Sequence, residues 1–165
     1  MDLRVGLGHD IHRLAAGGTL VLGGVVIAHE SGLCGHSDAD VLLHALTDAL
    51  LGAAGLGDIG ELFPNTDEAN RDRDSAEMLR LAYEQVLAAG YRVGNLDCVV
   101  VAQRPKLSPY KQSIRERIAE ILDIAPTAVG IKAKTGEDVG PVGREEAIEA
   151  QCVALLTRKK ENDGR

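Results

Sequence analysis

The sequence predicts a single α+β domain, a mixed β-sheet with helices packed on one face. A chain of 165 residues is long enough to bury about 68–70% of its unfolded surface as one domain. Aromatic residues are scarce, with one Phe, three Tyr and no Trp. The core must therefore be built from aliphatic side chains, which suits helices packed on a sheet. Strand-like and helical runs alternate without repeats or a linker. We expect the domain to cover residues 1–158 and a polar tail to follow at 159–165.

The net charge of −7 argues against nucleic acid as a partner. Nucleic acids are bound by Lys/Arg surfaces that displace counterions, and the basic block of this chain is the short run 158–160. Cys34, Cys98 and Cys152 are far apart and fit no metal-ligand spacing. With an odd cysteine count, no secretory leader and no membrane-length apolar run, we expect a cytoplasmic protein with reduced thiols and no membrane partner.

The first third of the chain predicts two strands and a long helix. Residues 3–14 alternate as a strand does, and Gly6 and Gly8 permit a close backbone approach. Residues 19–27 form a second strand pattern, and we expect the two to pair as a hairpin followed by a loop. A helix then starts with Ser37 as its N-cap. Its buried face is expected at Leu42, Leu43, Leu46, Ala49 and Leu50.

The rest of the chain alternates helices with buried strands. A second amphipathic helix starts at Asp74 or Ser75, runs to Ala89 and is closed by Gly90. Residues 147–156 are apolar enough for a strand or a helix, and periodicity alone does not decide between them. Between these segments the sequence predicts a strand at 96–102, a helix at 110–122, a strand at 129–133 and a Gly-rich loop at 134–144.

One carboxylate and two imidazoles form a candidate metal site. Asp10 and His12 are two residues apart in a strand, so their side chains point to the same side. His44, from the long helix, adds a nitrogen. Two His and one carboxylate leave one coordination position open, as in a catalytic zinc site. From spacing alone, a solvated Asp-x-His pair and a core histidine are the alternatives.

Two further carboxylates share a helix face with His44. Asp40, His44 and Asp48 are four residues apart and therefore stack along one side of the helix. A polar stripe on a buried helix is costly unless it is paired. We expect Asp40 or Asp48 to orient the imidazole of His44 as a hydrogen-bond acceptor. A capping or surface role is the alternative for Asp40.

Two glycine-rich loops are candidates for ligand binding. In the first, Gly57 and Gly60 surround Asp58, whose carboxylate and neighbouring amides suit a hydroxylated ligand. A plain helix end and turn explains the same residues equally well. In the second, Thr135 and free amides suit a phosphate, and the oxygens of Glu137 suit Mg²⁺. An ordinary surface loop is the alternative there.

Four stretches together resemble the 2-C-methyl-D-erythritol 2,4-cyclodiphosphate synthase family of the non-mevalonate isoprenoid (terpenoid) pathway. They are RVGLGHDIHRL, HSDADVLLHALTDALLGAAGLGDIGELFPNTD, AQRPKLSP and KAKTGEDVGPVGREEAI, in the family's order over almost the whole chain. The resemblance implies a metal-dependent cyclase, which is a phosphorus–oxygen lyase. In that reaction the 2-phosphate of 4-diphosphocytidyl-2-C-methyl-D-erythritol 2-phosphate attacks the β-phosphorus. The 2,4-cyclodiphosphate forms and CMP leaves.

The resemblance also implies roles for individual residues. Asp10, His12 and His44 match the ligands of a zinc ion or another divalent metal. Glu137 matches a residue that helps to hold a second ion, Mg²⁺ or Mn²⁺, on the substrate diphosphate, and Thr135 matches a phosphate-binding position. These five are the expected catalytic residues. Substrate-binding positions are further matched by His36, Ser37, Asp58 and Gly60 around the methylerythritol phosphate, by Ala102, Lys106, Leu107 and Ala133 around the cytidine and its phosphates, and by Arg144 at a central cavity. Lys134 stands where some family members carry Thr, and we expect this added cation to contribute to substrate binding.

The resemblance finally implies a homotrimer with active sites between neighbouring subunits. Its partners would be the small cytidine diphosphate substrate and an isoprenoid phosphate in the central cavity. Two other classes stay open. A mononuclear non-haem Fe(II) enzyme also uses two His and a carboxylate, although usually on a many-stranded β-barrel. A non-catalytic trimer that binds a nucleotide or an isoprenoid would release no CMP.

Overall fold

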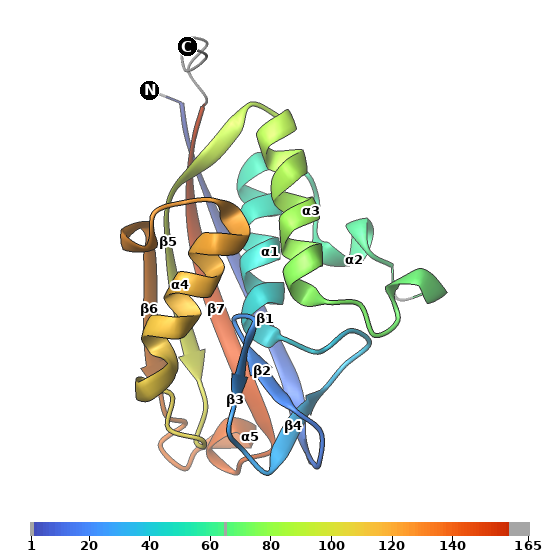
Figure 1. Ribbon diagram of the computed structural model, residues 1–165, viewed down its shortest axis with the longest axis vertical. Helices are drawn as coiled ribbons and strands as arrows, with labels where there is room; N and C mark the ends of the chain where they lie inside the picture. The colour runs from blue at the N-terminus through green and yellow to red at the C-terminus, as the bar shows by residue number, and fades with distance from the viewer. Residues whose placement is uncertain (1, 65, 159–165) are drawn as a thin grey trace.

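The computed structural model describes residues 2–64 and 66–158 (Figure 1). The polar tail predicted at 159–165 lies outside the described residues. A five-stranded sheet has antiparallel neighbours except at one end, where two strands run parallel, so the sheet is mixed as predicted. From edge to edge its strands are β4 (Ser31–Cys34), β1 (Leu3–Ala16), β7 (Ala147–Arg158), β5 (Tyr91–Val101) and β6 (Val129–Lys134).

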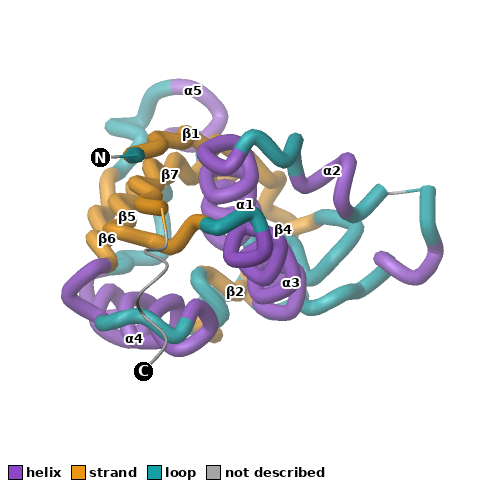
Figure 2. The backbone as a smooth tube through the Cα atoms, turned by 90° about the horizontal axis from the view of Figure 1, so that it is seen from above, coloured by secondary structure: helices purple, strands orange, loops and turns teal. Residues whose placement is uncertain are grey.

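Three long helices cover one face of this sheet (Figure 2). They are α1 (Val41–Ala54), α3 (Ser75–Ala88) and α4 (Lys111–Leu122). The core between helices and sheet is aliphatic, as the composition predicted. None of the described helices has the length and apolar run that a bilayer crossing requires. The shorter helical pieces are α2 (Ile59–Leu62), α5 (Gly140–Gly143) and three 3₁₀ turns at Glu68–Asn70, Ser108–Tyr110 and Pro126–Ala128.

Helix α1 rests directly on the backbone of β1, because two glycines leave room for it. A Cβ atom at Gly8 would lie 1.8 Å from the carbonyl oxygen of Ala45, and one at Gly6 would lie 1.9 Å from that of Ala49. No side chain fits at such distances without moving the helix. The close approach predicted for both glycines is confirmed, and it brings the two elements with the candidate metal ligands together.

The hairpin predicted between residues 3–14 and 19–27 is wrong. The second segment divides into β2 (Leu20–Leu22) and β3 (Val25–Ile27), which pair with each other in a separate two-stranded sheet. The turn between them lies at Gly23 and Gly24, whose N–H groups donate to the carboxylate of Asp40 at 2.9 and 2.7 Å. The first strand pairs instead with β4, inside the segment predicted as a loop.

The N-cap of the first long helix also differs from the prediction. Asp40, not Ser37, caps α1, and its Oδ1 accepts from the N–H groups of Leu42 and Leu43 at 3.2 and 3.1 Å. Asp74 caps α3 through the N–H of Ala76 at 2.7 Å, as predicted. Residues 147–156, for which periodicity allowed either a strand or a helix, belong to the strand β7. The side chains of β7 alternate between buried and exposed along most of its length.

Candidate active site

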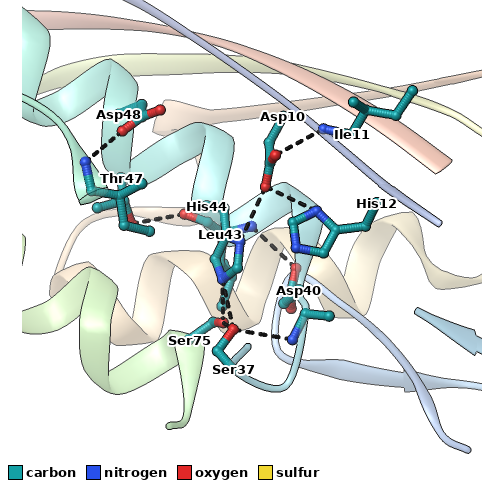
Figure 3. A network of polar contacts seen from close by, with 12 residues as sticks. Asp10, Ile11, His12, Ser37, Asp40, Leu43, His44, Thr47, Asp48 and Ser75 are labelled. Carbon is teal, nitrogen blue, oxygen red and sulfur yellow. Dashed lines mark hydrogen bonds and ion pairs between the residues drawn. The ribbon is translucent and has the colours of Figure 1, made fainter. Parts of the chain in front are cut away.

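The structure brings the three predicted metal ligands together. Asp10 and His12 lie on β1 and His44 on α1, and their donor atoms all lie within 4.8 Å of one another (Figure 3). The Oδ2 atom of Asp10 is 3.1 Å from the Nδ1 atom of each imidazole. The cluster is half-buried, with 27% of the Asp10 side chain and 14% and 12% of the His12 and His44 side chains exposed.

The arrangement of these atoms fits a divalent metal. Among the described residues, the buried Nδ1 atom of His12 has no hydrogen-bond partner of acceptable geometry, although Oδ2 of Asp10 is 3.1 Å away. Two electron-pair donors this close without a well-formed hydrogen bond are stabilised by a cation between them. Two imidazole nitrogens and one carboxylate oxygen are also the donor types that Zn²⁺ prefers.

Electrostatics favours the ionised carboxylate that metal binding requires. Burial by itself would raise the pKa of Asp10, but the two neighbouring imidazoles of His12 and His44 outweigh it, so the pKa lies well below its usual range. Burial would lower the pKa of His12, but the neighbouring Asp10 outweighs this and raises it. A metal that binds here near neutral pH therefore has no proton to displace from Asp10.

A glycine that the sequence analysis did not single out makes room for His12. A Cβ atom at Gly35 would lie 2.9 Å from both Cδ2 and Nε2 of the imidazole, and 2.8 Å from the Cβ of Ala39. Gly35 precedes His36 at the end of the loop into α1, so its neighbours in sequence carried no signal of this contact. Its role follows only from the packing of that loop against β1.

The prediction that Asp40 or Asp48 orients His44 is wrong. The carboxylate of Asp40 is fully buried and accepts from four backbone N–H groups, and burial nevertheless raises its pKa to about 6. The carboxylate of Asp48 accepts from the N–H of Ile59 at 2.8 Å, which ties α1 to the start of α2. Both carboxylates therefore anchor backbone, one at a turn and one at a short helix.

Two hydroxyl groups take the place predicted for these carboxylates. The Nε2 atom of His44 lies 3.0 Å from Oγ of Ser37 and 2.9 Å from Oγ of Ser75 (Figure 3). Ser75 is the first residue of α3 and is fully buried. It lies 31 residues from His44, so no local pattern pointed to it.

A cavity of about 220 Å³ opens beside the triad. The predicted substrate-binding residues His36, Ser37 and Gly60 line it. The buried Nδ1 atom of His36 has no hydrogen-bond partner in the described chain, so it is available to a ligand. Asp58 does not line this cavity, and its carboxylate caps α2 by accepting from the N–H of Glu61 at 2.8 Å. The remaining lining residues are Asp10, His12, His44, Asp48, Ile59, Phe63, Asn70 and Met78.

A second, larger hollow of about 760 Å³ lies at the ends of β5 and β6. It gathers six predicted binding residues, namely Ala102, Lys106, Leu107, Ala133, Lys134 and Thr135. His29 and Glu30, from the loop after β3, also line it, and the sequence analysis missed both. Glu137 adjoins it, since its Oε1 accepts from the hydroxyl of Thr135 at 2.7 Å.

The chain matches the model of the YgbB family over residues 3–157. It belongs to the YgbB family. The 2-C-methyl-D-erythritol 2,4-cyclodiphosphate synthase of Shouchella clausii (strain KSM-K16) is 54% identical over 156 residues, which cover 94% of this chain and 98% of that protein. These matches confirm the family resemblance that the four sequence stretches indicated.

Solved structures agree with this YgbB-family assignment. A CDP-bound form of 2C-methyl-D-erythritol-2,4-cyclodiphosphate synthase has a TM-score of 0.87 and 38% identity, and the match covers 93% of this chain and all of that one. The bifunctional IspDF from Campylobacter jejuni has a TM-score of 0.92 and 43% identity. The match covers 95% of this chain but only 42% of that protein.

The two hollows of this YgbB-family chain are separate. Among the described residues, none lines both. The first holds the metal triad, and the second holds the loops predicted to bind a nucleotide. Arg144 lines neither hollow, and its guanidinium pairs with Glu146 at 2.9 and 3.0 Å. The predicted residues thus fall into two groups within one chain.

Proposed function

We propose that this chain is a 2-C-methyl-D-erythritol 2,4-cyclodiphosphate synthase. Its reaction would convert 4-diphosphocytidyl-2-C-methyl-D-erythritol 2-phosphate to the 2,4-cyclodiphosphate and CMP. The observation that carries this proposal is the triad of Asp10, His12 and His44 beside a cavity lined by His36 and Ser37. The sequence supports the proposal as well, because it is 54% identical to a 2-C-methyl-D-erythritol 2,4-cyclodiphosphate synthase.

The triad would hold a divalent metal, for which zinc is our proposal. Zinc bound there supplies Lewis-acid polarisation of a phosphate oxygen. Asp10 contributes an ionised oxygen, since its pKa is depressed, and each imidazole contributes a nitrogen. Residues of α1, α2 and β1 line the cavity beside the triad, where a ligand phosphate would reach the metal.

The substrate would be divided between the two hollows. His36 and Ser37 offer an imidazole nitrogen and a hydroxyl to the methylerythritol phosphate beside the triad. Lys106, Lys134 and Thr135 offer two cations and a hydroxyl to the cytidine diphosphate. Glu137 would hold Mg²⁺ or Mn²⁺ on that diphosphate, because hard cations prefer carboxylate oxygens.

The residues that line the two hollows would position the substrate phosphates and neutralise their charge. The attacking 2-phosphate is already an anion, so no side chain has to remove a proton from it. Its oxygen forms the new bond to the β-phosphorus as the bond from that phosphorus to the CMP oxygen breaks, and the electron pair leaves with CMP. Aligning the two phosphates and stabilising the charge on the departing CMP account for the catalysis.

We propose further that the enzyme is a homotrimer built on the bare face of the sheet. Val5 and Leu7 are each 68% exposed, and Ile11 is 44% exposed, all on the side of β1 opposite Gly6, Gly8 and Asp10. Val153 of β7 is 42% exposed. His9 and Glu149 form an ion pair on the same face between Leu7 and Ile11, and exposed apolar side chains bordered by polar ones are typical of a protein interface. In such a trimer the nucleotide hollow of one subunit would complete the metal hollow of its neighbour.

Two smaller assignments belong to the same proposal. Arg144 is 58% exposed and would face a central cavity of the trimer, where a guanidinium suits an isoprenoid phosphate. We also place the enzyme in the cytoplasm, where the three cysteines remain reduced.

Light scattering of the purified protein tests the trimer directly, and a mass close to one chain would contradict it.

The first test of the function measures metal content and CMP release together. For the parent with Mg²⁺ present, we expect about one zinc per chain and release of CMP from the cytidylylated substrate. For His44→Ala we expect both to be lost. A zinc-free parent that binds CDP without releasing CMP would instead support the binding trimer.

A further inference from the structure

The hydroxyl of Ser75 bridges a metal ligand and a carboxylate that no sequence pattern had linked to it. Oγ of Ser75 lies 2.9 Å from Nε2 of His44 and donates to Oδ1 of Asp38. The N–H of Ser75 donates to the other oxygen of Asp38 at 3.3 Å. Ser75 is fully buried at the start of α3, whereas Asp38 lies in the turn before α1. Three segments of the chain thus meet at one serine.

The positions of the protons follow from what each group is able to donate. A carboxylate only accepts, so the single hydroxyl proton of Ser75 is committed to Asp38. Oγ of Ser75 is then left with lone pairs, and the hydrogen bond to His44 requires a proton on Nε2. In a neutral imidazole the other nitrogen, Nδ1, is unprotonated. This is the atom that lies 3.1 Å from Oδ2 of Asp10 in the triad.

We propose that Asp38 and Ser75 are positioning residues that fix the tautomer and orientation of His44, so that Nδ1 is the nitrogen presented to a metal. Two hydrogen bonds hold Asp38 in place. The N–H of Asp40 donates to Oδ1 of Asp38 at 3.2 Å, and the N–H of Asp38 donates to the carbonyl of Arg73 at 3.2 Å. The carboxylate is therefore fixed relative to both α1 and α3. The proposal rests on the metal site of the proposed function and identifies what organises it.

Ser37 has a different part, although its hydroxyl is also near His44. Its Oγ accepts from the N–H of Ala39 at 3.1 Å and lies 3.0 Å from Nε2 and 3.3 Å from Oγ of Ser75. No carboxylate among the described residues takes its proton, and Ser37 lines the cavity beside the triad. Because the proton of Ser75 is committed to Asp38, the Ser37 hydroxyl is the donor in their 3.3 Å contact, and a ligand oxygen in the cavity can compete for that proton while Ser75 acts on the imidazole. The two serines divide recognition from positioning.

The experiment compares Ser75→Ala and Asp38→Asn with the parent in the full chain. Ser75→Ala removes the hydroxyl whose proton is committed to Asp38 and leaves Nε2 with Oγ of Ser37, which can donate as well as accept. Asp38→Asn keeps the shape but has one acceptor oxygen in place of two, so it no longer accepts from both the hydroxyl and the N–H of Ser75, and the hydroxyl proton is less firmly held away from Nε2. Loss of such a partner typically costs 10–100-fold in metal affinity, so we expect roughly that increase in the zinc dissociation constant, measured by competition with a chelator.

A matched control separates this effect from damage to the start of α3. Asp74 caps the same helix through Ala76 and is one residue from Ser75, but its carboxylate makes no described contact with His44. Asp74→Ala should lower thermal stability and leave the zinc dissociation constant within a few-fold of the parent. An equal loss of zinc affinity in Asp74→Ala would mean that Ser75 acts only through the helix start.

A second readout does not depend on the metal at all. In the metal-free protein labelled with ¹⁵N-histidine, the ring nitrogen shifts of His44 report which nitrogen carries the proton. Without a metal, Oδ2 of Asp10 can draw a proton onto Nδ1, so the informative nitrogen is Nε2: we expect it to be protonated in the parent and to lose that proton at least in part in both variants. If both variants keep the parent tautomer and zinc affinity, the proposal is overturned. A parent that binds no zinc would refute the proposed metal site, and the ring shifts would still test the positioning of His44 by itself.

Discussion

The two hollows of the molecule are built in opposite ways. The metal triad lies where α1 presses on β1, and its side chains are held by contacts from four segments. The nucleotide hollow is more than three times larger and is lined by loops, with Lys106 and Thr135 toward solvent. There the hydroxyl of Thr135 is paired with Glu137, and both side chains are exposed. One region is held by packing between a helix and a strand, and the other is lined by exposed side chains of loops.

This difference follows from what each region has to bind. A metal ion requires donor atoms at fixed short distances, which a packed helix and strand provide. A flexible diphosphate and a nucleoside require charge and hydrogen bonds that adapt as they bind. In the proposed trimer the second region is also completed by a neighbouring chain. Changes that damage packing should therefore remove the metal site first, and changes at the loops should spare it.

The largest effect is expected from Gly8→Ala, which attacks the packed region. The new Cβ atom would lie 1.8 Å from the carbonyl oxygen of Ala45, so α1 has to move away from β1 and takes His44 with it. We expect the free energy of unfolding to fall by roughly 3 kcal/mol or more and zinc binding to be lost. Urea denaturation and metal content measure both.

Gly52→Ala is the matched control for this change. Gly52 is an exposed residue in the same helix, and no described atom outside its own helix backbone and its neighbours lies within 4 Å of its added Cβ. Alanine there should stabilise the protein by roughly 0.5–1 kcal/mol. If Gly8→Ala also retained full stability and zinc, the metal site would not depend on this contact.

Val5→Asp tests whether the two regions cooperate between subunits. A carboxylate in the middle of the apolar sheet face should break the proposed trimer, while the triad on the other face of β1 is unchanged. We expect a monomer that binds zinc within a few-fold of the parent but releases almost no CMP. Val26, 65% exposed on β3, gives the control Val26→Asp, which should leave mass and activity unaltered. An active Val5→Asp monomer would show that one chain holds a complete site.

Glu137→Gln changes the loop-lined region and leaves the metal triad intact. The amide keeps a hydrogen-bond acceptor for Thr135 but lacks the charge that a second cation requires. CMP release should fall on the order of 10²-fold, the size typical of removing one group that stabilises developing charge. Zinc content should stay at the parent value, and more Mg²⁺ should restore part of the rate. Zinc loss in this variant would contradict the independence of the two regions.

The last effect concerns the buried Asp40 in the packed region and depends on pH. Its pKa is raised from 3.8 to about 6 in the folded chain, because burial outweighs the hydrogen bonds from Gly24, Gly23 and Leu43. Between these values the folded chain holds a proton that the unfolded chain has released. The free energy of unfolding should therefore fall as pH rises from about 4 to about 6, by up to about 3 kcal/mol at roughly 1.4 kcal/mol per pKa unit.

Asp40→Asn isolates this contribution in the metal-free protein. The variant should be less stable overall, because its NH₂ group faces N–H donors, but its stability should depend less on pH over this range. Burial raises the pKa of Asp48 as well, so part of the slope remains. The pKa of His12 is raised from its ordinary 6.5, so its contribution to the free energy of unfolding changes above pH 6.5, outside the range from about pH 4 to about pH 6. Equal slopes in the two proteins, measured by urea denaturation at several pH values, would exclude Asp40 as the source.

The sequence predicted the elements that periodicity and caps define. The long first strand, the capped α3 and the helix at α4 all lie where the patterns placed them. It failed where a distant polar group decides the outcome. The turn at Gly23 and Gly24 is fixed by Asp40, 16 or 17 residues away, and this contact splits the predicted second strand.

The candidate site shows the same limit. Asp10, His12 and His44 were recognisable because strand and helix geometry place them on facing sides, and the family motif contains them. The partners of His44 were not recognisable. Spacing of four residues suggested Asp40 and Asp48, whereas the structure uses Ser75, which folds back from another helix. Hydrogen bonds between segments depend on tertiary packing, which no local pattern encodes.

The two glycines of β1 also select the register of the sheet. Successive side chains of a strand point to opposite faces, so a slip of one residue would turn Val5, Leu7 and His9 toward α1. These side chains do not fit where even a Cβ atom would overlap a helix carbonyl. Gly6 and Gly8 therefore exclude a pairing with β7 that is shifted by one residue. The same spacing that admits the helix thus ensures that Asp10 and His12 point toward α1 and that the apolar residues of β1 stay on the outside.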